Sequence, residues 1–250
     1  MAAKTARGNR HIEVERKFDV PPGTVFPSFD GLWAVARVER MPAQSLDAVY
    51  FDTPKHDLAA HRVTLRRRTG GPDAGWHLKL PAGADARTEV HAPLDADSAD
   101  QPPGQLVDIV LAIVRDRPLA PVARIATTRN VVLLHGADGG ALAEFCDDEV
   151  TAWTLADGGQ DNEQQWHEWE LELVDGTAEG GADLLDRLGN RLLDAGATPA
   201  GHGSKLAKVL DAAVSVPPDA PEPPADPVHR AVAEQVAELL AWDRAVRADV

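Results

Sequence analysis

Charged side chains occupy every second position in several short segments of this sequence, and no other feature restricts the fold as strongly. In residues 12–18, Glu13, Glu15 and Lys17 alternate with mainly apolar neighbours. Successive side chains of a β-strand point to opposite faces of the sheet, so these three charges are expected on one face. The same alternation recurs in residues 63–68, 76–80, 87–92, 144–148 and 167–174. The pattern predicts a sheet of short strands, each with one charged face.

The signs of these charges are segregated between segments. Glu168, Glu170 and Glu172 form an acidic row, whereas Arg66 and Arg68 form a basic pair. Like charges side by side on a solvated strand repel, so the segregation favours charged faces that converge on one cavity. Clustered carboxylates suit a hard cation such as Mg²⁺ or Mn²⁺, and inward Arg and Lys suit phosphate. An ordinary solvated sheet face is the alternative for residues 12–18 taken alone.

The apolar faces of such strands would point outward and need helices over them. Residues 106–116 and 182–195 have the helical period expected of these covers. The arrangement predicts an α+β domain whose barrel is inverted, with charges inside and apolar side chains outside.

Composition restricts the class of protein further. The 250 residues are 44% hydrophobic, which allows one large domain or one domain with an appendage. The net charge of −15 argues against a nucleic-acid partner, which would require a basic surface. No apolar run of about 18 residues occurs, and the first ten residues lack the pattern of a secretion signal. With Cys146 the sole cysteine, we expect a cytoplasmic protein that does not contact a membrane.

The chain divides into four stretches. We expect a disordered tail at 1–10, the α+β domain at 11–214, a linker at 215–227 and an amphipathic helix at 228–250. The linker is rich in proline, which removes backbone donors and favours an extended course. Val228, Val232 and Val236 begin an apolar stripe on the last helix. Either the first domain or a further domain absent from this chain is expected to cover that stripe.

An ordered set of charged motifs resembles the CYTH family of triphosphate tunnel metalloenzymes. The motifs are Glu13-x-Glu15-x-Lys17, Tyr50-Phe51-Asp52-Thr53, Leu65-Arg66-x-Arg68, Leu78-Lys79, Arg129, Asp148, Glu168-x-Glu170-x-Glu172 and Ser204-Lys205. The first motif has low specificity alone, but the match continues in order through nearly the whole first domain. The resemblance implies an eight-stranded antiparallel β-tunnel with a charged interior and helices outside.

The last helix carries a second resemblance. Residues 226–249 are similar to the opening helix of a CHAD domain, an all-helical module that commonly follows CYTH and is associated with polyphosphate. The remainder of such a module is absent from this sequence. The prediction is a truncated CYTH–CHAD protein, in which the CHAD domain is a partner only in the full-length protein.

The CYTH resemblance also implies roles for individual residues. The predicted ligands of Mg²⁺ or Mn²⁺ are Glu13, Glu15, Asp148, Glu168, Glu170 and Glu172. The predicted phosphate-binding residues are Lys17, Arg66, Arg68, Lys79, Arg87, Arg129 and Lys205. The predicted catalytic residues are Glu168, Glu170 and Lys17.

Some of these roles have structural alternatives. Arg87 could instead pair with Glu89 or another tunnel acid, Lys205 could be an exposed lysine, and Asp148 could cap a turn. Arg129 is preferred to Arg124, and because five positions separate the two they are expected to face opposite ways. Residues 50–53 are expected to be structural, and His77 and His91 to be interior histidines rather than ligands.

The predicted activity is metal-dependent hydrolysis of a linear triphosphate. Phosphoryl transfer needs metal and Arg or Lys to neutralise charge on oxygen, and a group that positions water. We expect inorganic tripolyphosphate to yield pyrophosphate and phosphate. The alternatives are an adenylate cyclase of class IV, a thiamine triphosphatase, and a non-catalytic module that binds polyphosphate.

Overall fold

The computed structural model describes residues 10–94, 101–155, 162–213 and 227–248. The predicted tail, except Arg10, and the predicted linker, except Pro227, lie outside these residues. The strands are β1 (Arg10–Asp19), β2 (Arg37–Arg40), β3 (Gln44–Asp52), β4 (Thr64–Thr69), β5 (Gly75–Pro81), β6 (Ala86–Ala92), β7 (Ala120–His135), β8 (Ala141–Thr154), β9 (Gln164–Leu173) and β10 (Thr198–Pro199). The helices are α1 (Asp57–Ala60), α2 (Gly104–Ile109), α3 (Leu111–Val114), α4 (Gly181–Asp194), α5 (Lys205–Ala213) and α6 (Pro227–Ala248).

Eight strands close into a barrel in the order β1-β6-β5-β4-β3-β7-β8-β9, and β9 returns to β1. Every neighbouring pair is antiparallel. Strand β1 completes the ring by changing partner, because Arg10–Val14 pair with β6 and Glu15–Asp19 pair with β9. The short strands β2 and β10 add to β7 and to the end of β1. The predicted eight-stranded antiparallel tunnel is therefore confirmed.

Apolar side chains cover much of the barrel's outer surface, as the alternation requires. Helices α2 and α3 pack on the outward face of β4–β6, where Leu65, Trp76 and Leu78 are fully buried. Helix α4 packs on β1 and β9 through Leu185 and Leu188. Burying each such side chain contributes about 1.5–3 kcal/mol. Because these side chains lie between the strands and the outer helices, much of the hydrophobic core of this fold lies outside the barrel wall.

Helix α5 occupies a different position, at one end of the barrel. It packs against the inward-facing residues Tyr50 and Ile125 through Leu206 and Val209. The interior is therefore charged along the cavity but apolar where α5 closes it, and the prediction of a charged interior did not include this apolar end. Lys205, the first residue of α5, consequently faces the cavity.

The predicted helices are found with different boundaries. The segment predicted as one helix at 106–116 forms α2 and α3, separated at Val110, whose φ of −106° and ψ of 11° interrupt the helix. The helix predicted at 182–195 is α4, and the one predicted at 228–250 is α6. Within the described part of the chain, no helix combines the length and the hydropathy needed to cross a membrane.

In the described part of the chain, helix α6 contacts α2 and α3 near its C-terminal end. There Ala248 is buried, and Arg247 donates to the carbonyl oxygen of Asp108 in α2 at 3.4 Å. The apolar stripe predicted on this helix is exposed to solvent: Val228, Val232, Val236, Leu239, Trp242 and Val246. The contact with α2 and α3 therefore leaves most of the stripe uncovered.

Candidate active site

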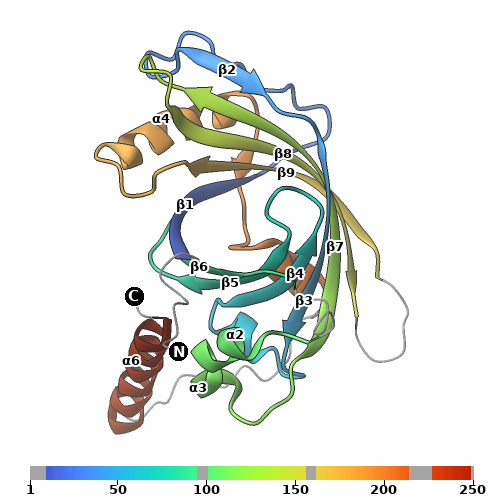
Figure 1. Cartoon of the computed structure of the whole chain (residues 1–250), viewed down its shortest axis with the longest axis vertical. Helices are drawn as coiled ribbons and strands as arrows, with labels where there is room; N and C mark the ends of the chain where they lie inside the picture. The colour runs from blue at the N-terminus through green and yellow to red at the C-terminus, as the bar shows by residue number, and fades with distance from the viewer. Residues whose placement is uncertain (1–9, 95–100, 156–161, 214–226, 249–250) are drawn as a thin grey trace, which may run out of the picture.

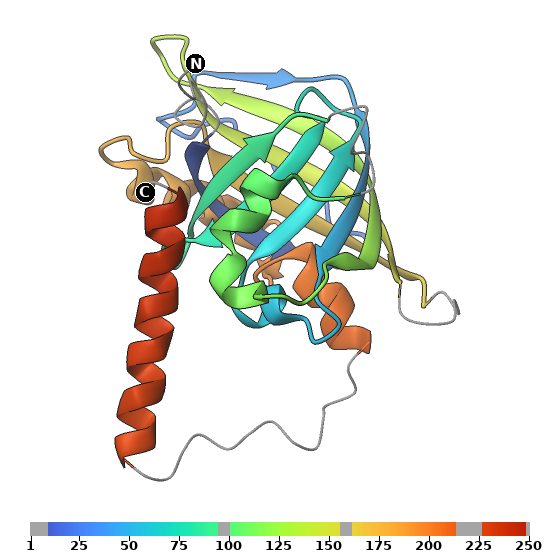
Figure 2. The same ribbon diagram turned by 60° about the horizontal axis from the view of Figure 1, so that its bottom comes forward.

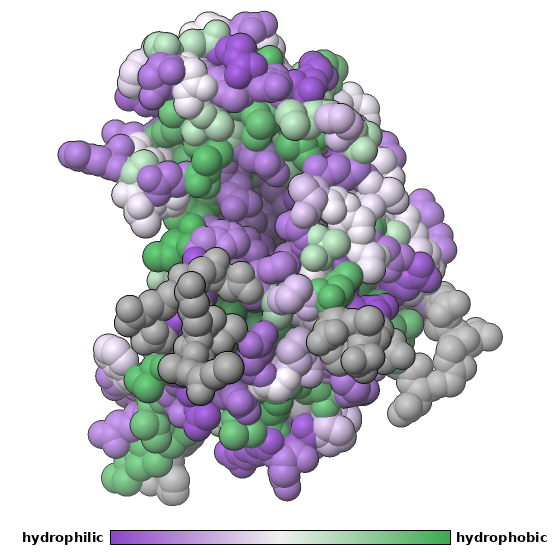
Figure 3. Space-filling view, viewed as in Figure 1, coloured by the Kyte–Doolittle hydropathy of each residue, from purple (hydrophilic) through white to green (hydrophobic). Residues whose placement is uncertain are grey.

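The barrel encloses a cavity of about 560 Å³ that is lined mainly by charged side chains. Its mouth is visible in Figure 3 as a hollow of hydrophilic residues framed by apolar ones. The charged and histidine residues that line it are Arg10, His11, Glu13, Glu15, Lys17, Arg66, Arg68, Asp73, His77, Lys79, Arg87, Glu89, His91, Arg129, Glu144, Glu170, Glu172 and Lys205. The acidic and basic faces of separate strands therefore converge on one enclosed space.

Asp148 and Glu168 lie behind this lining rather than on it. Both are buried, with 0% and 5% of their surface exposed. Each pairs with Lys205, whose Nζ lies 2.8 Å from Asp148 Oδ2 and 2.6 Å from Glu168 Oε1. The structure thus brings all predicted metal and phosphate residues into one region, although not all of them reach the open space.

The carboxylates divide into two groups of possible metal ligands. One comprises His11, Glu13 and Glu172, and the other comprises Asp148, Glu168 and Glu170, with ligand atoms within 4.8 Å of one another in each group. A cationic side chain already lies within the second group, because Lys205 Nζ is also 2.8 Å from Glu170 Oε1. In the first group Lys79 pairs with Glu13, whereas Glu172 has no Lys or Arg partner among the described residues, so this group is the better fit for a divalent ion.

Glu172 is the clearest member of that group. Among the described residues, no Lys or Arg nitrogen lies within ion-pair distance of its carboxylate. Burial, together with the negative charges of Glu13, Glu15 and Glu170, raises the pKa of Glu172 to about 7. A divalent ion would relieve this repulsion, and oxygen ligands are those that Mg²⁺ and Mn²⁺ prefer.

Lys17 joins Glu170, a member of the second group, to Glu15 on its own strand. Its Nζ donates to Glu15 Oε2 at 2.7 Å and to Glu170 Oε1 at 2.6 Å. Burial opposes charge on all three side chains, but their mutual attraction outweighs it. The pKa of Lys17 is raised, and those of Glu15, to about 2, and Glu170 are lowered. These groups are therefore ionised at neutral pH.

The basic residues come from several walls of the cavity. Arg66 on β4 donates to Tyr50 Oη at 3.2 Å, and Lys79 on β5 lies 2.6 Å from Glu13 Oε2. Arg129 on β7 donates to Asp148 Oδ1 at 2.8 Å, while Arg124 faces outward and pairs with Asp47, as the alternation predicts. Phosphate oxygens have the charge and geometry to replace such partners of guanidinium and ammonium groups.

Arg68 is held differently from these residues. It pairs with Asp73 in the turn between β4 and β5. Burial, and the positive charges of Arg66 and Arg129, lower the pKa of Arg68 to about 9. An anion placed among these three guanidinium groups would relieve their repulsion, which supports the predicted role of Arg68 in binding phosphate.

Two histidines lie beside this basic cluster. His77 contacts Glu89 Oε1 at 2.9 Å through Nδ1, and the Asp73 carbonyl oxygen at 3.0 Å through Nε2. Burial dominates its titration and lowers the pKa of His77 to about 4. His77 is therefore a neutral, bonded interior residue, and the ring of His91 packs against it with centroids 4.9 Å apart.

Cys146 and Asp52 have structural surroundings. Burial raises the pKa of the Cys146 thiol, which lies 3.2 Å from Glu144. Asp52 accepts hydrogen bonds from the backbone N–H groups of Leu58 and Ala59 at 2.9 and 3.0 Å, and so orders the first turn of α1. The expectation of a structural role for residues 50–53 thus fits Asp52 but not Tyr50, which faces the cavity.

Several lining residues were not among the predicted site residues. They include Arg10, His11, Tyr50, Thr64, Asp73, Glu89, Thr127, Glu144 and Ser204. Alternation points to His11, because it lies two positions before Glu13, and to Tyr50, which shares a face with Ala48. Asp73 lies in a turn, where no periodicity applies.

Comparison with known proteins supports the same fold. The model of the CYTH domain matches residues 11–196. Relatives in two strains of Mycobacterium tuberculosis, each named only as an uncharacterized protein, are 65% identical over 259 residues. These matches cover 100% of this chain and 50% of each relative, so the chain spans about half the length of the curated relatives it matches.

A crystal structure of a candidate adenylate cyclase from Bacillus halodurans shares the fold with a TM-score of 0.53. It is 19% identical, and the match covers 80% of this chain and 98% of that chain. The closed barrel, its ion-lined cavity and the family match lead to one assignment. The chain belongs to the CYTH family, whose domain model matches residues 11–196.

Proposed function

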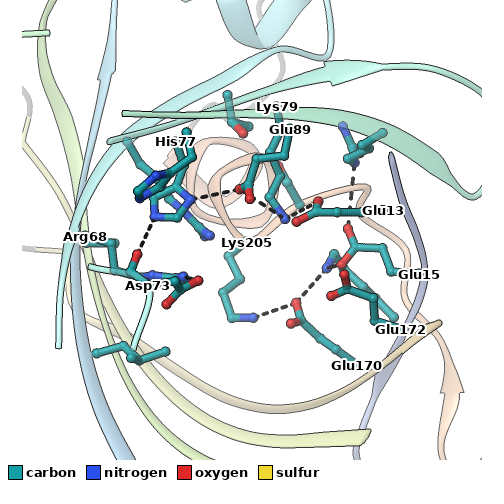
Figure 4. A pocket seen from close by; sticks show the side chains of 18 of the residues that line it. Glu13, Glu15, Arg68, Asp73, His77, Lys79, Glu89, Glu170, Glu172 and Lys205 are labelled. Atoms are coloured by element: carbon teal, nitrogen blue, oxygen red, sulfur yellow. Dashed lines mark hydrogen bonds and ion pairs between the residues drawn. The ribbon is translucent and has the colours of Figure 1, made fainter. Parts of the chain in front are cut away.

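We propose that this protein hydrolyses inorganic tripolyphosphate to pyrophosphate and orthophosphate. The observation that carries the proposal is the pairing, inside one cavity, of Arg and Lys side chains from several strands with a carboxylate group that lacks full neutralisation. The first set suits a chain of phosphates, and the second suits the divalent ion that accompanies it. In Figure 4, Glu13, Glu15, Glu170 and Glu172 gather on one side of the space and Arg68 lies on the other, while Lys79 and Lys205 reach the carboxylates.

The basic residues bind and orient the substrate in this proposal. Arg66, Arg68 and Arg129 converge from β4 and β7, and their N–H groups would exchange present partners for phosphate oxygens. Lys79 and Lys205 add ammonium charges near the two carboxylate groups. Because these donors are already placed, their positive charge opposes the charge that develops on oxygen during phosphoryl transfer.

The carboxylates fit a divalent ion, with Glu13 and Glu172 as its principal ligands and Glu15 and Glu170 at its border. When bound, Mg²⁺ or Mn²⁺ neutralises phosphate oxygens and makes water more acidic. Among the residues of this chain, Glu170 orients the attacking water by accepting a hydrogen bond. The low pKa of Glu170 suits orientation better than proton removal.

Lys17 keeps Glu170 and Glu15 in place in this proposal. Its raised pKa keeps it protonated, so it fixes Glu170 and Glu15 from one side and offers a charge to the reacting phosphate. Glu168 is bonded to Lys205 behind Glu170 and positions that lysine. Both roles depend on close contact in a site largely shielded from water.

The cavity favours an inorganic substrate, because its lining has few aromatic side chains on which a nucleobase could stack. Its described lining contains no tryptophan or phenylalanine, and its aromatic members are Tyr50 and three histidines. Nucleobase and thiamine rings bind most strongly where flat apolar side chains stack on them. An adenylate cyclase activity, suggested by the name of the Bacillus halodurans protein, requires such recognition of adenine.

A phosphate-release assay tests the proposal. Tripolyphosphate, thiamine triphosphate, ATP and long-chain polyphosphate are compared with Mg²⁺, with Mn²⁺ and with chelator, and cyclic AMP is measured in parallel. We expect release to be fastest from tripolyphosphate and to require metal. Glu13→Gln should lower the rate by about 100-fold or more, because it removes a ligand charge at the reacting centre.

Two results would overturn the proposal. Formation of cyclic AMP from ATP would assign the site to cyclisation. Tight binding of tripolyphosphate without release, under every divalent metal, would assign it to a non-catalytic module that binds polyphosphate.

A further inference from the structure

Three cavities meet at Arg87. The tunnel cavity is separated there from a second space of about 440 Å³, which we call the side chamber, and from a smaller one of about 110 Å³. Arg87 and Gly203 line all three. The side chamber lies between β1, α4 and residues 199–203, and exposed residues such as Arg62 and Asn190 place it at the molecular surface. Glu15 and Lys17 of β1 also line both the tunnel and the side chamber, so Arg87 and Gly203 complete a partition that β1 begins between the tunnel and a lateral route to solvent.

The course of β1 explains why a partition exists at this point. Strand β1 pairs with β6 only as far as Val14 and Ala86, and from Glu15 onward it pairs with β9. One more backbone hydrogen bond, from the Glu15 N–H to the Asp85 carbonyl oxygen at 3.0 Å, follows before β1 leaves β6, and the barrel wall opens beside Asp85 and Ala86. Arg87, the next residue of β6, lies at the edge of this opening with its side chain 12% exposed.

The hydrogen bonds of Arg87 span the opening. Its Nη2 donates to the carbonyl oxygen of Gly203 at 2.7 Å, and its Nη1 donates to that of Arg62 at 3.2 Å. Its Nε lies 3.9 Å from Glu15 Oε1. Arg87 therefore ties the segment before α5 to the turn before β4, two pieces of backbone that lie outside the ring of strands.

This bonding distinguishes Arg87 from the other arginines of the cavity. Arg66 and Arg129 donate to side chains, which can rotate away when a phosphate arrives. The acceptors of Arg87 are backbone carbonyls, which cannot move without moving their segments. A Cβ atom at position 203 would lie 3.2 Å from Arg87 Nη2, so the glycine permits this close contact.

We propose that Arg87 determines the chain length of the substrate by closing the side of the tunnel. This inference rests on the proposed function and adds a specificity-determining residue to it. With the partition closed, the cavity holds a short chain such as tripolyphosphate. With it open, a longer polyphosphate can extend from the tunnel through the side chamber to solvent.

The side chamber itself is a passage rather than a strong anion site. Its best-placed cation, Arg16, already lies 3.0 Å from Asp85 and 2.6 Å from Asp186. Acidic and basic residues are mixed along its wall. A chain that passes through would gain little binding there, so the effect of opening depends on removing the barrier.

The test compares tripolyphosphate and long-chain polyphosphate in the variants Arg87→Met and Arg87→Lys. Arg124→Met is the matched control, because Arg124 is bonded to Asp47 on the outer surface. We expect Arg87→Met to raise the ratio of kcat/KM for the long chain over that for tripolyphosphate by roughly tenfold, with the control unchanged. A residue that only binds phosphate would lower both values together and leave the ratio as in the wild type, which would overturn the proposal.

The variant Arg87→Lys shows whether the effect on the substrate ratio depends on the hydrogen-bond geometry of the side chain or on its charge. Lysine keeps the charge, but its single ammonium cannot span both carbonyls. We expect its ratio to rise as in Arg87→Met. A wild-type ratio in the lysine variant, beside a raised one in the methionine variant, would attribute the effect to charge and contradict the partition. The lysine variant also serves as the test if Arg87→Met does not fold.

Binding without turnover makes the result independent of the proposed function. Titration calorimetry with chelator present compares the affinity of each variant for the two phosphates. We expect Arg87→Met to bind the long chain more tightly relative to tripolyphosphate than the wild type does. If the wild type hydrolyses neither compound, the proposed function fails while this measurement still decides the role of Arg87.

Discussion

Glu172 differs from the other carboxylates of the cavity in the sign of the charges around it. Glu15 and Glu170 both contact Lys17, whereas the groups that act most on Glu172, besides Lys79, are acidic. Burial and this repulsion raise its pKa to about 7. A single side chain therefore carries much of the unfavourable electrostatic energy of the site, which a divalent ion can remove.

A pH prediction follows from this residue. A carboxyl group whose pKa is raised from 4.5 to about 7 stabilises the folded state below pH 4.5 and loses that contribution as the pH rises through 7. In chelator at about pH 8, Glu172→Gln should raise the free energy of unfolding by roughly 1–3 kcal/mol, and this gain should shrink towards acidic pH. Thermal melts across pH measure it, with the exposed Glu149→Gln as control. Parallel pH profiles for wild type and Glu172→Gln would contradict the assigned cause.

Strand β4 shows how one element serves two environments. Arg66 faces the cavity, and its neighbour Arg67 faces outward and is only partly buried. The alternation of β-strands thus places identical side chains one position apart on opposite surfaces of the same wall. Arg66 and Arg67 therefore allow the inward and outward faces of β4 to be compared with the same type of side chain.

We predict different consequences for methionine at these two positions. Arg66→Met removes a charged donor from the phosphate site, and a charge-assisted bond of about 1.5–3 kcal/mol corresponds to a rise in KM of roughly 10- to 100-fold. Arg67→Met should change KM by no more than about threefold, because the side chain of Arg67 lies on the outward face and is not part of the cavity lining. Initial rates with tripolyphosphate measure both, and melting curves establish that each variant folds. Equal effects on KM would refute the inward assignment of Arg66.

Sequence periodicity predicted the elements with strong alternation and missed those defined by their neighbours. The faces of β1, β4 and β9 follow from the spacing of their charges alone. Helix α5 does not, because its apolar residues follow a glycine-rich stretch, and its position depends on inward residues of other strands. The break between α2 and α3 at Val110 was also missed. It arises from the backbone dihedral angles of Val110, within an apolar run whose helical periodicity continues unchanged.

The pairing of charges within the site could not be predicted for the same reason. That Lys205 lies among Asp148, Glu168 and Glu170 depends on where α5 enters the barrel. That Arg87 bonds to two backbone carbonyls depends on β1 changing partner at Glu15. Both follow from strand order and chain path, which are non-local properties of the fold.

The whole molecule carries a net charge of −15, yet its cavity gathers basic side chains from several strands. The surrounding negative potential attracts divalent cations and disfavours a free polyanion. A metal-bound phosphate is therefore the form of substrate best suited to approach this protein.

Helix α6 extends from the barrel with an exposed apolar stripe. Of the two covers predicted for it, the first domain leaves most of the stripe exposed, and cover by a further domain remains a prediction.

Divalent cations should stabilise the whole chain even without substrate. A ligand at 100 times its Kd adds about 2.7 kcal/mol to the free energy of unfolding. We expect Mg²⁺ or Mn²⁺ to raise the melting temperature of the wild type by several degrees, and chelator to reverse it. Glu13→Gln should reduce this rise in melting temperature. K⁺ that supplies the same concentration of positive charge should not reproduce the rise in the wild type. A shift of the same size in the variant would place the ion elsewhere.

The inverted barrel has an evolutionary consequence. Since each strand buries its aliphatic side chains against the outer helices and offers its charges to the bore, folding and selectivity are encoded at different positions of the same segment. Exchanges among interior residues can alter which anion is accepted while leaving the shell intact. A scaffold organised in this way can diversify its chemistry at a smaller cost to its architecture than a barrel whose interior is its hydrophobic core.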